Sequence, residues 1–177
     1  MRILGVDPGS RVAGYGIIDG GLRDSTCIAA GVLRADGADI AARLGSIQTE
    51  LAALIRQHQP EVLSIEKVFV GRNIASALML GQSRGALLAC SGQAGLGLAE
   101  YSASQIKKAV VGSGRASKEQ VRHMVGILLK MDASQQELDC TDALAVALCH
   151  AHSAPLAART GMPAGARWTR RSQRSKR

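Results

Sequence analysis

Aromatic residues and paired cysteines are what this sequence has least of. Phenylalanine, tryptophan and tyrosine make up 2% of the 177 residues, so the single phenylalanine, Phe69, stands out. The four cysteines lie in apolar or helical stretches, and none is part of a Cys-x-x-Cys pair; they are Cys27, Cys90, Cys140 and Cys149. Neither a disulfide framework nor a zinc knuckle is therefore indicated, and the thiols are expected to be reduced core residues.

The sequence also lacks a long hydrophobic run and a leader pattern. No stretch approaches the ~18 consecutive apolar residues of a membrane span. Met1 is followed almost at once by a short apolar run that ends at Asp7, not by a basic and then an apolar leader region. We therefore expect a cytoplasmic protein without membrane contact, of the size of one domain.

Acidic residues are absent from the end of the chain and scarce in its middle. Residues 159–177 hold seven of the 22 Lys and Arg residues and no acid, so most of the net charge of +8 lies there. Residues 67–131 hold nine basic residues against two acids, whereas residues 132–158 hold four acids and no base. Such segregation is typical of a phosphate-binding surface around a carboxylate metal site, although charge runs also form ordinary solvated faces.

The apolar pattern of the first half predicts an α/β fold. Three strands with no helix between them predict an antiparallel meander; they cover residues 2–7, 14–19 and 26–34. Apolar residues recur with a helical period from Ile40 to Ile55, which predicts a helix that stops before Pro60. A strand over residues 62–66, reached through that helix, is expected to lie parallel to the first strand.

The second half is expected to be rich in helix. Residues 74–90 have helical composition, and the small residues Gly81, Gly85 and Ala89 form a stripe that indicates close helix packing. Residues 96–100 are a candidate last strand.

Two capping-box signatures predict the remaining helices. Ser117 with Gln120 starts a helix through Lys130, and Ser134 with Glu137 starts one that runs to about His152. The expected domain therefore covers residues 1–154. Residues 155–177 are expected to be a basic, disordered tail.

Four carboxylates stand out from these patterns. Asp7 and Glu66 end two apolar runs, and adjacent parallel strands lie about 4.8 Å apart, so both side chains reach one place. Asp139 and Asp142 are three residues apart, hence on one face of the expected helix. Converging carboxylates repel each other and require a divalent cation, and oxygen-only ligands favour Mg²⁺ or Mn²⁺. Two such ions support phosphodiester hydrolysis.

Each of these signals has an ordinary structural alternative. An aspartate before Pro-Gly is a common turn former, and an acid pair near a helix start commonly complements the helix dipole. His150 and His152 beside Cys149 suggest a zinc site, but a fourth ligand is missing.

Four blocks of the sequence resemble, in order and spacing, the RuvC family of Holliday-junction resolvases. The first block is Ile3 to Gly16, and the last is Asp139 to Ala145, where the family has an acid pair. The two middle blocks are Ile65–Phe69 with Asn73–Ser76 and Leu80–Gly85, then Tyr101, Gln105–Lys107, Val110–Gly114 and Lys118. The resemblance runs from about residue 2 to residue 152.

The resemblance implies a Mg²⁺-dependent crossover junction endodeoxyribonuclease with an RNase H-like fold. That fold is a mixed sheet, an antiparallel meander followed by parallel strands, flanked by helices. The implied catalytic acids and metal ligands are Asp7, Glu66, Asp139 and Asp142, holding two Mg²⁺ ions for which Mn²⁺ substitutes. Family members act as homodimers that nick opposed strands of a four-way junction in homologous recombination and DNA repair, which implies RuvA and RuvB as partners.

The implied DNA-binding residues surround these acids. Lys107 and Lys118 match basic positions of the family, and further basic residues extend a phosphate track; they are Arg72, Arg84, Lys108, Arg115 and Arg122. The family has a DNA-contacting aromatic residue at the position of Phe69. That ring either stacks on an unpaired base or packs in the core.

Two other functions share parts of this pattern. The Asp-Pro-Gly-Ser turn also resembles the phosphate-binding hairpin of actin-like ATPases, which usually have two such domains. A junction-binding module without catalysis would not need the four acids. The stripe of Gly81, Gly85 and Ala89 is the candidate contact of the homodimer.

Overall fold

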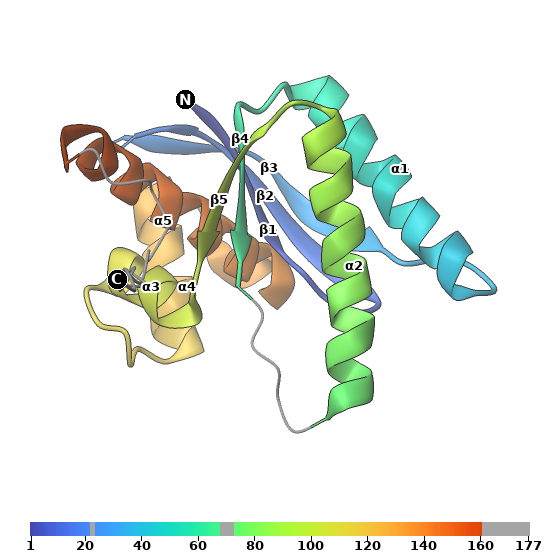
Figure 1. The fold of residues 1–177 in the computed structure, drawn as a ribbon. Coiled ribbons are helices and arrows are strands. Elements are labelled where there is room, and N and C mark those ends of the chain that lie inside the picture. The colour runs from blue at the N-terminus through green and yellow to red at the C-terminus, as the bar shows by residue number, and fades with distance from the viewer. Residues whose placement is uncertain (22–23, 68–72, 161–177) are drawn as a thin grey trace, which may run out of the picture.

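A five-stranded mixed sheet forms the centre of the protein (Figure 1). The computed structural model describes residues 1–21, 24–67 and 73–160, with side chains described as far as Ala154. The strands are β1 (Arg2–Asp7), β2 (Val12–Gly20), β3 (Ser25–Arg34), β4 (Val62–Glu66) and β5 (Gly97–Tyr101). Their order is β3-β2-β1-β4-β5; the first three are antiparallel, and β4 and β5 run parallel to β1. The expected meander followed by parallel strands is confirmed.

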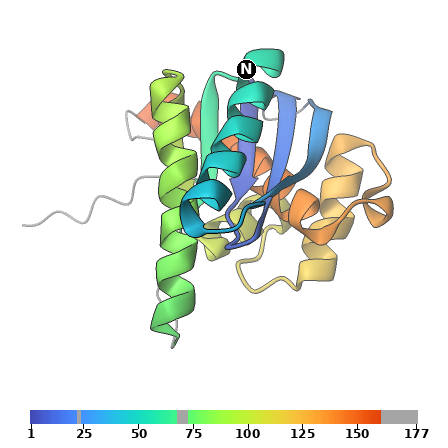
Figure 2. The same ribbon diagram turned by 90° about the vertical axis from the view of Figure 1, so that its right-hand side faces the viewer.

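Helices cover both faces of this sheet (Figures 1 and 2). One face carries α1 (Ile40–His58) and α2 (Ile74–Gln93), packed over a core that includes Leu4, Val6 and Leu63. The other carries α3 (Ala103–Val111), α4 (Lys118–Leu129) and α5 (Leu138–Thr160), with Ile3 and Leu144 in their core. None of the helices in the described part of the chain is long and apolar enough to cross a membrane.

The helix starts follow local capping chemistry, with two departures from expectation. Ser117 and Gln120 form the expected capping box of α4. Ser102 and Gln105 form the same box for α3, a helix that the sequence interpretation missed although the signal is present. The expected start at Ser134 is wrong: Ser134 lies in the 3-10 turn η1 (Ala133–Gln135), where Asp132 accepts hydrogen bonds from its backbone N and its Oγ.

The last helix is longer than expected. It begins at Leu138 and continues through Pro155 to Thr160, so the predicted end near His152 is wrong. A proline inside a helix removes one hydrogen bond and tends to kink the helix, but it does not have to end it. The boundary at residue 154 between the expected domain and the basic tail remains a prediction. Residues 161–177 lie outside the described residues.

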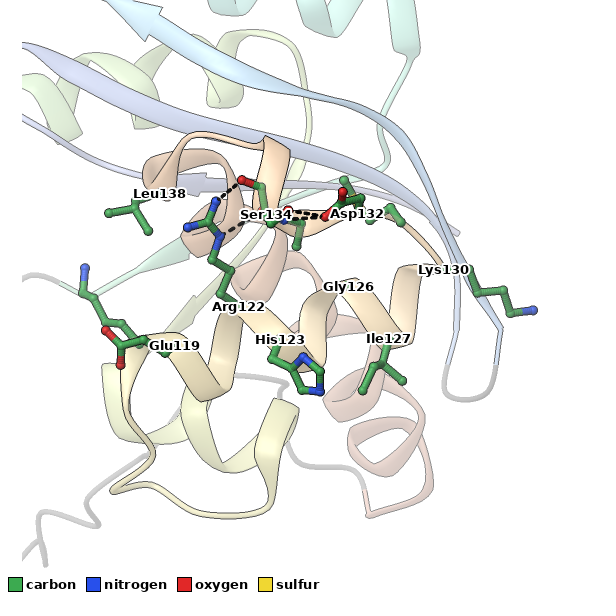
Figure 3. A pocket seen from close by; sticks show the side chains of 12 residues that line it. Glu119, Arg122, His123, Gly126, Ile127, Lys130, Asp132, Ser134 and Leu138 are labelled. Carbon is green, nitrogen blue, oxygen red and sulfur yellow. Dashed lines mark hydrogen bonds between the residues drawn. The ribbon is translucent and has the colours of Figure 1, made fainter.

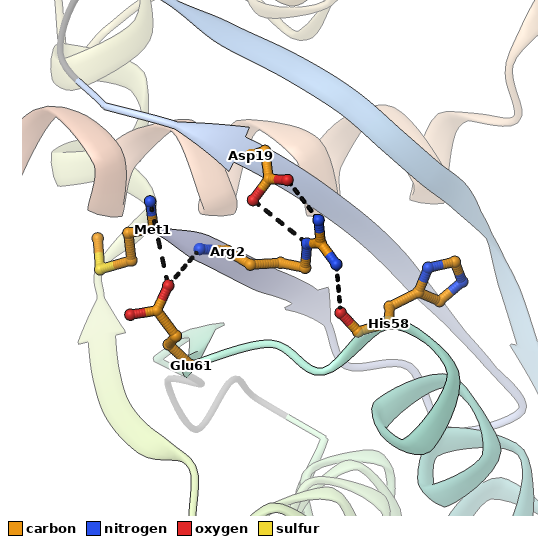
Figure 4. A network of polar contacts seen from close by, with 5 residues as sticks. All are labelled: Met1, Arg2, Asp19, His58 and Glu61. Carbon is orange, nitrogen blue, oxygen red and sulfur yellow. Dashed lines mark hydrogen bonds and ion pairs between the residues drawn. The ribbon is translucent and has the colours of Figure 1, made fainter.

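A network around Arg2 fixes the end of the sheet that lies away from the carboxyl end of β1 (Figure 4). The guanidinium donates to both carboxylate oxygens of Asp19 on β2, at 2.5 and 3.2 Å, and to the carbonyl of His58 at 2.7 Å. The backbone N of Arg2 donates to Glu61 Oε1. These bonds join β1, β2, the end of α1 and the segment before β4, so the register of the parallel pair is fixed at this end.

Candidate metal and nucleic-acid site

Two of the predicted carboxylates end neighbouring parallel strands. Asp7 is the last residue of β1 and Glu66 the last of β4, and the register pairs Val6 with Ile65 directly before them. Side chains alternate along a strand, and Val6 and Ile65 pack in the core beneath α1 and α2. Asp7 and Glu66 therefore lie on the opposite face, which α5 covers.

Glycines on the sheet allow α5 to come close enough to bring the other two carboxylates there. A Cβ atom added to Gly14 would lie 1.9 Å from the carbonyl oxygen of Asp139. One added to Gly5 would lie 2.2 Å from the carbonyl oxygen of Ala143, and one added to Gly16 would lie 2.6 Å from a methyl group of Leu144. Any larger residue on these strands would displace the start of α5, which carries Asp139 and Asp142.

The four carboxylates interact electrostatically. Burial raises the pKa of Asp7 to about 7, with further contributions from the negative charges of Glu66, Asp142 and Asp139. Burial also raises the pKa of Glu66, and the charge of Asp142 adds to this effect. Lys118 opposes both shifts. Such coupling occurs only when the groups are close, so the structure brings together all four predicted acids.

This donor set suits a hard divalent cation. All four side chains offer carboxylate oxygens, and a positive ion would favour the ionised form of the partly buried Asp7, whose pKa is raised. Within the described residues, no three Asp, Glu, His or Cys side chains are arranged closely enough to hold an ion as they stand. The carboxylates thus face one shared region, but their oxygens are not close enough together to coordinate one ion.

The alternative zinc site is not supported by the side-chain contacts. His150 Nδ1 is hydrogen-bonded to the hydroxyl of Tyr101 at 2.8 Å, and His152 Nδ1 is 3.0 Å from the carbonyl oxygen of Ala109. Burial raises the pKa of the Cys149 thiol to about 12, which disfavours the thiolate that zinc requires. These residues serve the packing of α5 against β5 and α3.

Two of the predicted cations border the acids. Lys118 Nζ at the start of α4 lies 2.9 Å from Asp142 Oδ2, and this contact raises the pKa of the lysine. Lys107 on α3 is close enough to Glu66 to oppose the rise of its pKa. Lys118 is 68% exposed, so its ammonium group is accessible to a ligand as well as to Asp142.

The other predicted DNA-binding residues are placed differently. Arg84 on α2 forms an ion pair with Glu100 of β5, and its Nε lies 3.4 Å from the carbonyl oxygen of Glu66. It therefore ties the end of β4 to α2 and β5. Phe69 and Arg72 lie outside the described residues.

Arg122 has a role that the sequence did not reveal (Figure 3). Its guanidinium donates to the carbonyl oxygens of Ala133, Ser134 and Gln136, at 2.8, 2.7 and 2.8 Å. These carbonyls belong to the segment that leads into α5, so the arginine fixes the approach to Asp139. The sequence does not reveal which backbone carbonyls an arginine will contact. The sequence therefore placed Arg122 among the residues that contact phosphate.

A hollow of about 930 Å³ lies next to the hydrogen bonds of Arg122, between α4 and the segment around η1 (Figure 3). Its lining includes Lys118 and Arg122 together with Ile127 and Leu138, two apolar side chains that are more than half exposed.

The protein has the features of the RNase H-like class. These are the strand order, the carboxylates at the ends of β1 and β4, and the helix that crosses them with an acid pair. The model of the RuvC family, described as crossover junction endodeoxyribonuclease RuvC, matches residues 3–150. The chain belongs to this family.

Curated relatives and solved structures agree with the family match. RuvC of Halorhodospira halophila is 54% identical over 162 residues, which cover 90% of this chain and 96% of the relative. RuvC of Shewanella sp. (strain MR-4) is 51% identical over 151 residues, covering 85% and 87%. The structure of T. thermophilus RuvC in complex with a Holliday junction substrate matches with a TM-score of 0.83 at 29% identity, over 88% of this chain and 96% of that one. A yeast mitochondrial Holliday junction resolvase, at 14% identity and a TM-score of 0.59 over 84% and 78%, shares the fold.

Proposed function

We propose that this protein is an endonuclease that resolves four-way DNA junctions by paired nicks in homologous recombination and repair. The observation that carries the proposal is the convergence of Asp7, Glu66, Asp139 and Asp142 at one end of the sheet in a chain of the RuvC family. An ATPase function would not require these four acids together. A relative of known structure was solved with the same kind of junction.

The carboxylates are the proposed metal ligands. Asp7, Glu66, Asp139 and Asp142 would hold two Mg²⁺ ions, for which Mn²⁺ substitutes because it shares the preference for oxygen ligands. When bound, the ions supply charge that activates water and stabilises the leaving oxygen of a phosphodiester. The raised pKa of Asp7 means that this residue must lose a proton before it serves as a ligand.

The cations next to the acids are the proposed contacts to the DNA backbone. Lys107 and Lys118 place positive charge on the α3 and α4 side of the carboxylates, where it offsets repulsion between the acids and a phosphate. DNA contacts of Phe69, Arg72 and Arg84 remain predictions. For Arg84, a contact would have to compete with its ion pair to Glu100.

We further propose that two copies of the chain pair through α2. Ile74 and Leu78 are 78% and 63% exposed, and Gly81, Gly85 and Ala89 continue that exposed face along the helix. Cβ atoms added at the two glycines would meet no atom within 4 Å in the described part of the chain, so these residues do not serve close packing there. A four-way junction is two-fold symmetric, and two coordinated nicks need two sites related by the same symmetry. Pairing of the apolar faces would supply that arrangement.

The cellular setting follows from the same proposal. RuvA and RuvB are the proposed partners in branch migration. All four cysteines are free thiols, as expected in the reducing cytoplasm, where we place the protein.

A synthetic four-way junction with Mg²⁺ tests the proposed function, with nick positions read on all four strands. We expect nicks at symmetric positions on two opposed strands. Asp139→Asn should abolish them while junction binding remains, because it removes a ligand charge without adding negative charge to the surface. Asp24→Asn, on an exposed residue before β3, is the control. Undiminished cleavage by Asp139→Asn would remove that residue from the site, and binding without cleavage by the unmodified protein would leave a junction-binding module.

A further inference from the structure

Three arginines form a second group of cations at the carboxylate end of the sheet. Arg11 lies directly before β2, Arg34 ends β3, and Arg43 lies near the start of α1. They line a hollow of about 370 Å³, whose other lining residues are Val12, Ala35, Asp36 and Gly37. Nothing in the proposed function uses this hollow.

Hydrogen bonds hold the walls of the hollow in place. The backbone N of Ala35 donates to the carbonyl of Arg11 at 2.8 Å. The hydroxyl of Ser46 on α1 donates to the carbonyl of Arg34 at 3.0 Å and accepts from the backbone N of Asp36 at 2.9 Å. The backbone of these residues is thus tied both to β2 and to α1, so the arginines extend from a fixed frame.

The guanidinium groups of this cluster differ from the engaged arginines elsewhere. Arg2 and Arg122 donate hydrogen bonds to carboxylates and carbonyls of the protein (Figures 3 and 4). Across the described residues, by contrast, neither Arg11 nor Arg43 forms an ion pair or a side-chain hydrogen bond. Arg34 pairs with Glu137 at 3.8 Å, with both side chains more than half exposed, and such pairs contribute little. The cluster therefore keeps donors available for a ligand.

The acids near the hollow form no ion pair with Arg11 or Arg43 among the described residues. Asp36 is the acid that lines the hollow. Asp39 accepts from the backbone N of Ala42 as the cap of α1, and Glu50 accepts from the backbone N of Arg34. Arginine donors in a planar fork match the oxygens of a phosphate group. The chemistry of the hollow is that of a phosphate site.

The hollow lies across the carboxylates from the lysines. The register pairs Asp7 with Gly14 and Val12 with Arg34, so Arg34 lies on the β3 side of the acids at the same end of the sheet. Arg11 lies in the loop between β1 and β2, and Arg43 lies on α1, the helix that covers the other face. Lys107 and Lys118 lie on the α3 and α4 side. A DNA strand that passes over the acids would meet cations on both sides.

We propose that Arg11, Arg34 and Arg43 bind a backbone phosphate of the DNA strand whose neighbouring phosphodiester lies at the carboxylates. This inference rests on the proposed function, since it assumes a DNA strand in that site. The bound phosphate fixes the strand on the second side of the site, so that both flanks of the reacting bond are held.

The test compares the double variant Arg11→Gln, Arg43→Gln with the control Arg56→Gln, an exposed arginine in the last turn of α1. Junction affinity is measured against salt concentration in EDTA, where no cleavage occurs. Each phosphate contact contributes about 0.9 to the slope of log affinity against log salt, so the double variant, which loses the contact to one phosphate, should lose about 0.9 of slope. The control should keep the slope of the unmodified protein. An unchanged slope in the double variant would overturn the proposal.

A scan with single neutral methylphosphonate linkages along the cleaved strand identifies the ligand. In the unmodified protein, neutralising one or two positions on one side of the nick should weaken binding at least several-fold. The double variant should be indifferent at those positions and still sensitive on the lysine side. Competition by inorganic phosphate that depends on the two arginines, without any such position, would assign the hollow to a free anion and refute the strand contact. Absence of cleavage by the unmodified protein in Mg²⁺ would instead refute the proposed function.

Discussion

The ammonium group of Lys118 lies 2.9 Å from Oδ2 of Asp142, which joins the start of α4 to the acid pair of α5. We expect Lys118→Ala to lower cleavage strongly, because the site loses a cation that offsets the acids and contacts phosphate. The salt dependence of junction binding should flatten by about 0.9 in slope. The exposed lysine should contribute less than about 1 kcal/mol to stability, checked by thermal unfolding. Lys118→Arg is the control, since it keeps the charge; equal loss in both variants would count against a charge effect.

The raised pKa of Asp7 predicts two effects of pH. Cleavage should fall as the pH drops below about 7, because the carboxyl binds a proton in place of a cation, and a higher Mg²⁺ concentration should move that fall to lower pH. An acid whose pKa is raised by folding favours the folded state below its unfolded pKa, and this contribution is lost as the pH rises through about 7. In EDTA, the gain in melting temperature of Asp7→Asn over the unmodified protein should therefore grow from pH 5 to pH 8. A gain that stays constant with pH would contradict the raised pKa of Asp7.

The contact between Gly14 and the backbone of Asp139 predicts a severe effect of one methyl group. Gly14→Ala would place its Cβ 1.9 Å from a carbonyl oxygen, so α5 must move away from the sheet. We expect loss of cleavage and a destabilisation of roughly 1 to 3 kcal/mol, measured by denaturant unfolding. Gly45→Ala on α1 is the matched control, because among the described residues its added Cβ meets no atom within 4 Å and alanine favours the helix. Normal cleavage by Gly14→Ala would show that the acid pair tolerates displacement of α5.

Arg122 should act through the backbone of the segment before α5, not through DNA. Arg122→Lys keeps the charge but cannot reproduce three bonds to the carbonyls of Ala133, Ser134 and Gln136. We expect it to lower cleavage and to raise the Mg²⁺ concentration needed for half-maximal rate, with little change in junction affinity or its salt slope. Arg122→Leu should behave similarly. A variant with weaker junction binding and normal Mg²⁺ dependence would place Arg122 in the phosphate track instead.

The exposed face of α2 predicts a dimer that a single side chain can disturb. Gly85→Leu adds a large side chain at an exposed position where an added Cβ meets no atom of the described residues within 4 Å, so folding should be preserved. We expect sedimentation to show a dimer for the unmodified protein at micromolar concentration and a shift toward monomer for the variant. Gly45→Leu on α1 serves as the control. An unchanged dimer in Gly85→Leu would place the interface elsewhere.

Local sequence determined most of the secondary structure of this protein. Alternation and helical periodicity, with stops such as Pro60, depend on residues a few positions apart, so the strands and the helices α1, α2 and α4 followed from them. The same patterns singled out Asp7 and Glu66, because each breaks an apolar run at its end. Ser102 with Gln105 carried an equally local signal for α3. The sequence interpretation nevertheless missed α3. It also misjudged the start and end of α5, because Asp132 binds Ser134 in a tight turn and Pro155 does not end the helix.

Tertiary structure decided the features that depend on contacts between distant parts of the chain. The approach of α5 to Gly5 and Gly14 converts two separate acid pairs into one coupled site, and burial there raises the pKa of Asp7. The partners of Arg122 are backbone carbonyls, which every residue possesses, so no pattern of side chains reveals them. The hollow of three arginines arises only where the loop between β1 and β2, the end of β3 and the start of α1 meet. Periodicity describes neighbours along the chain, whereas these arrangements are set by packing across it.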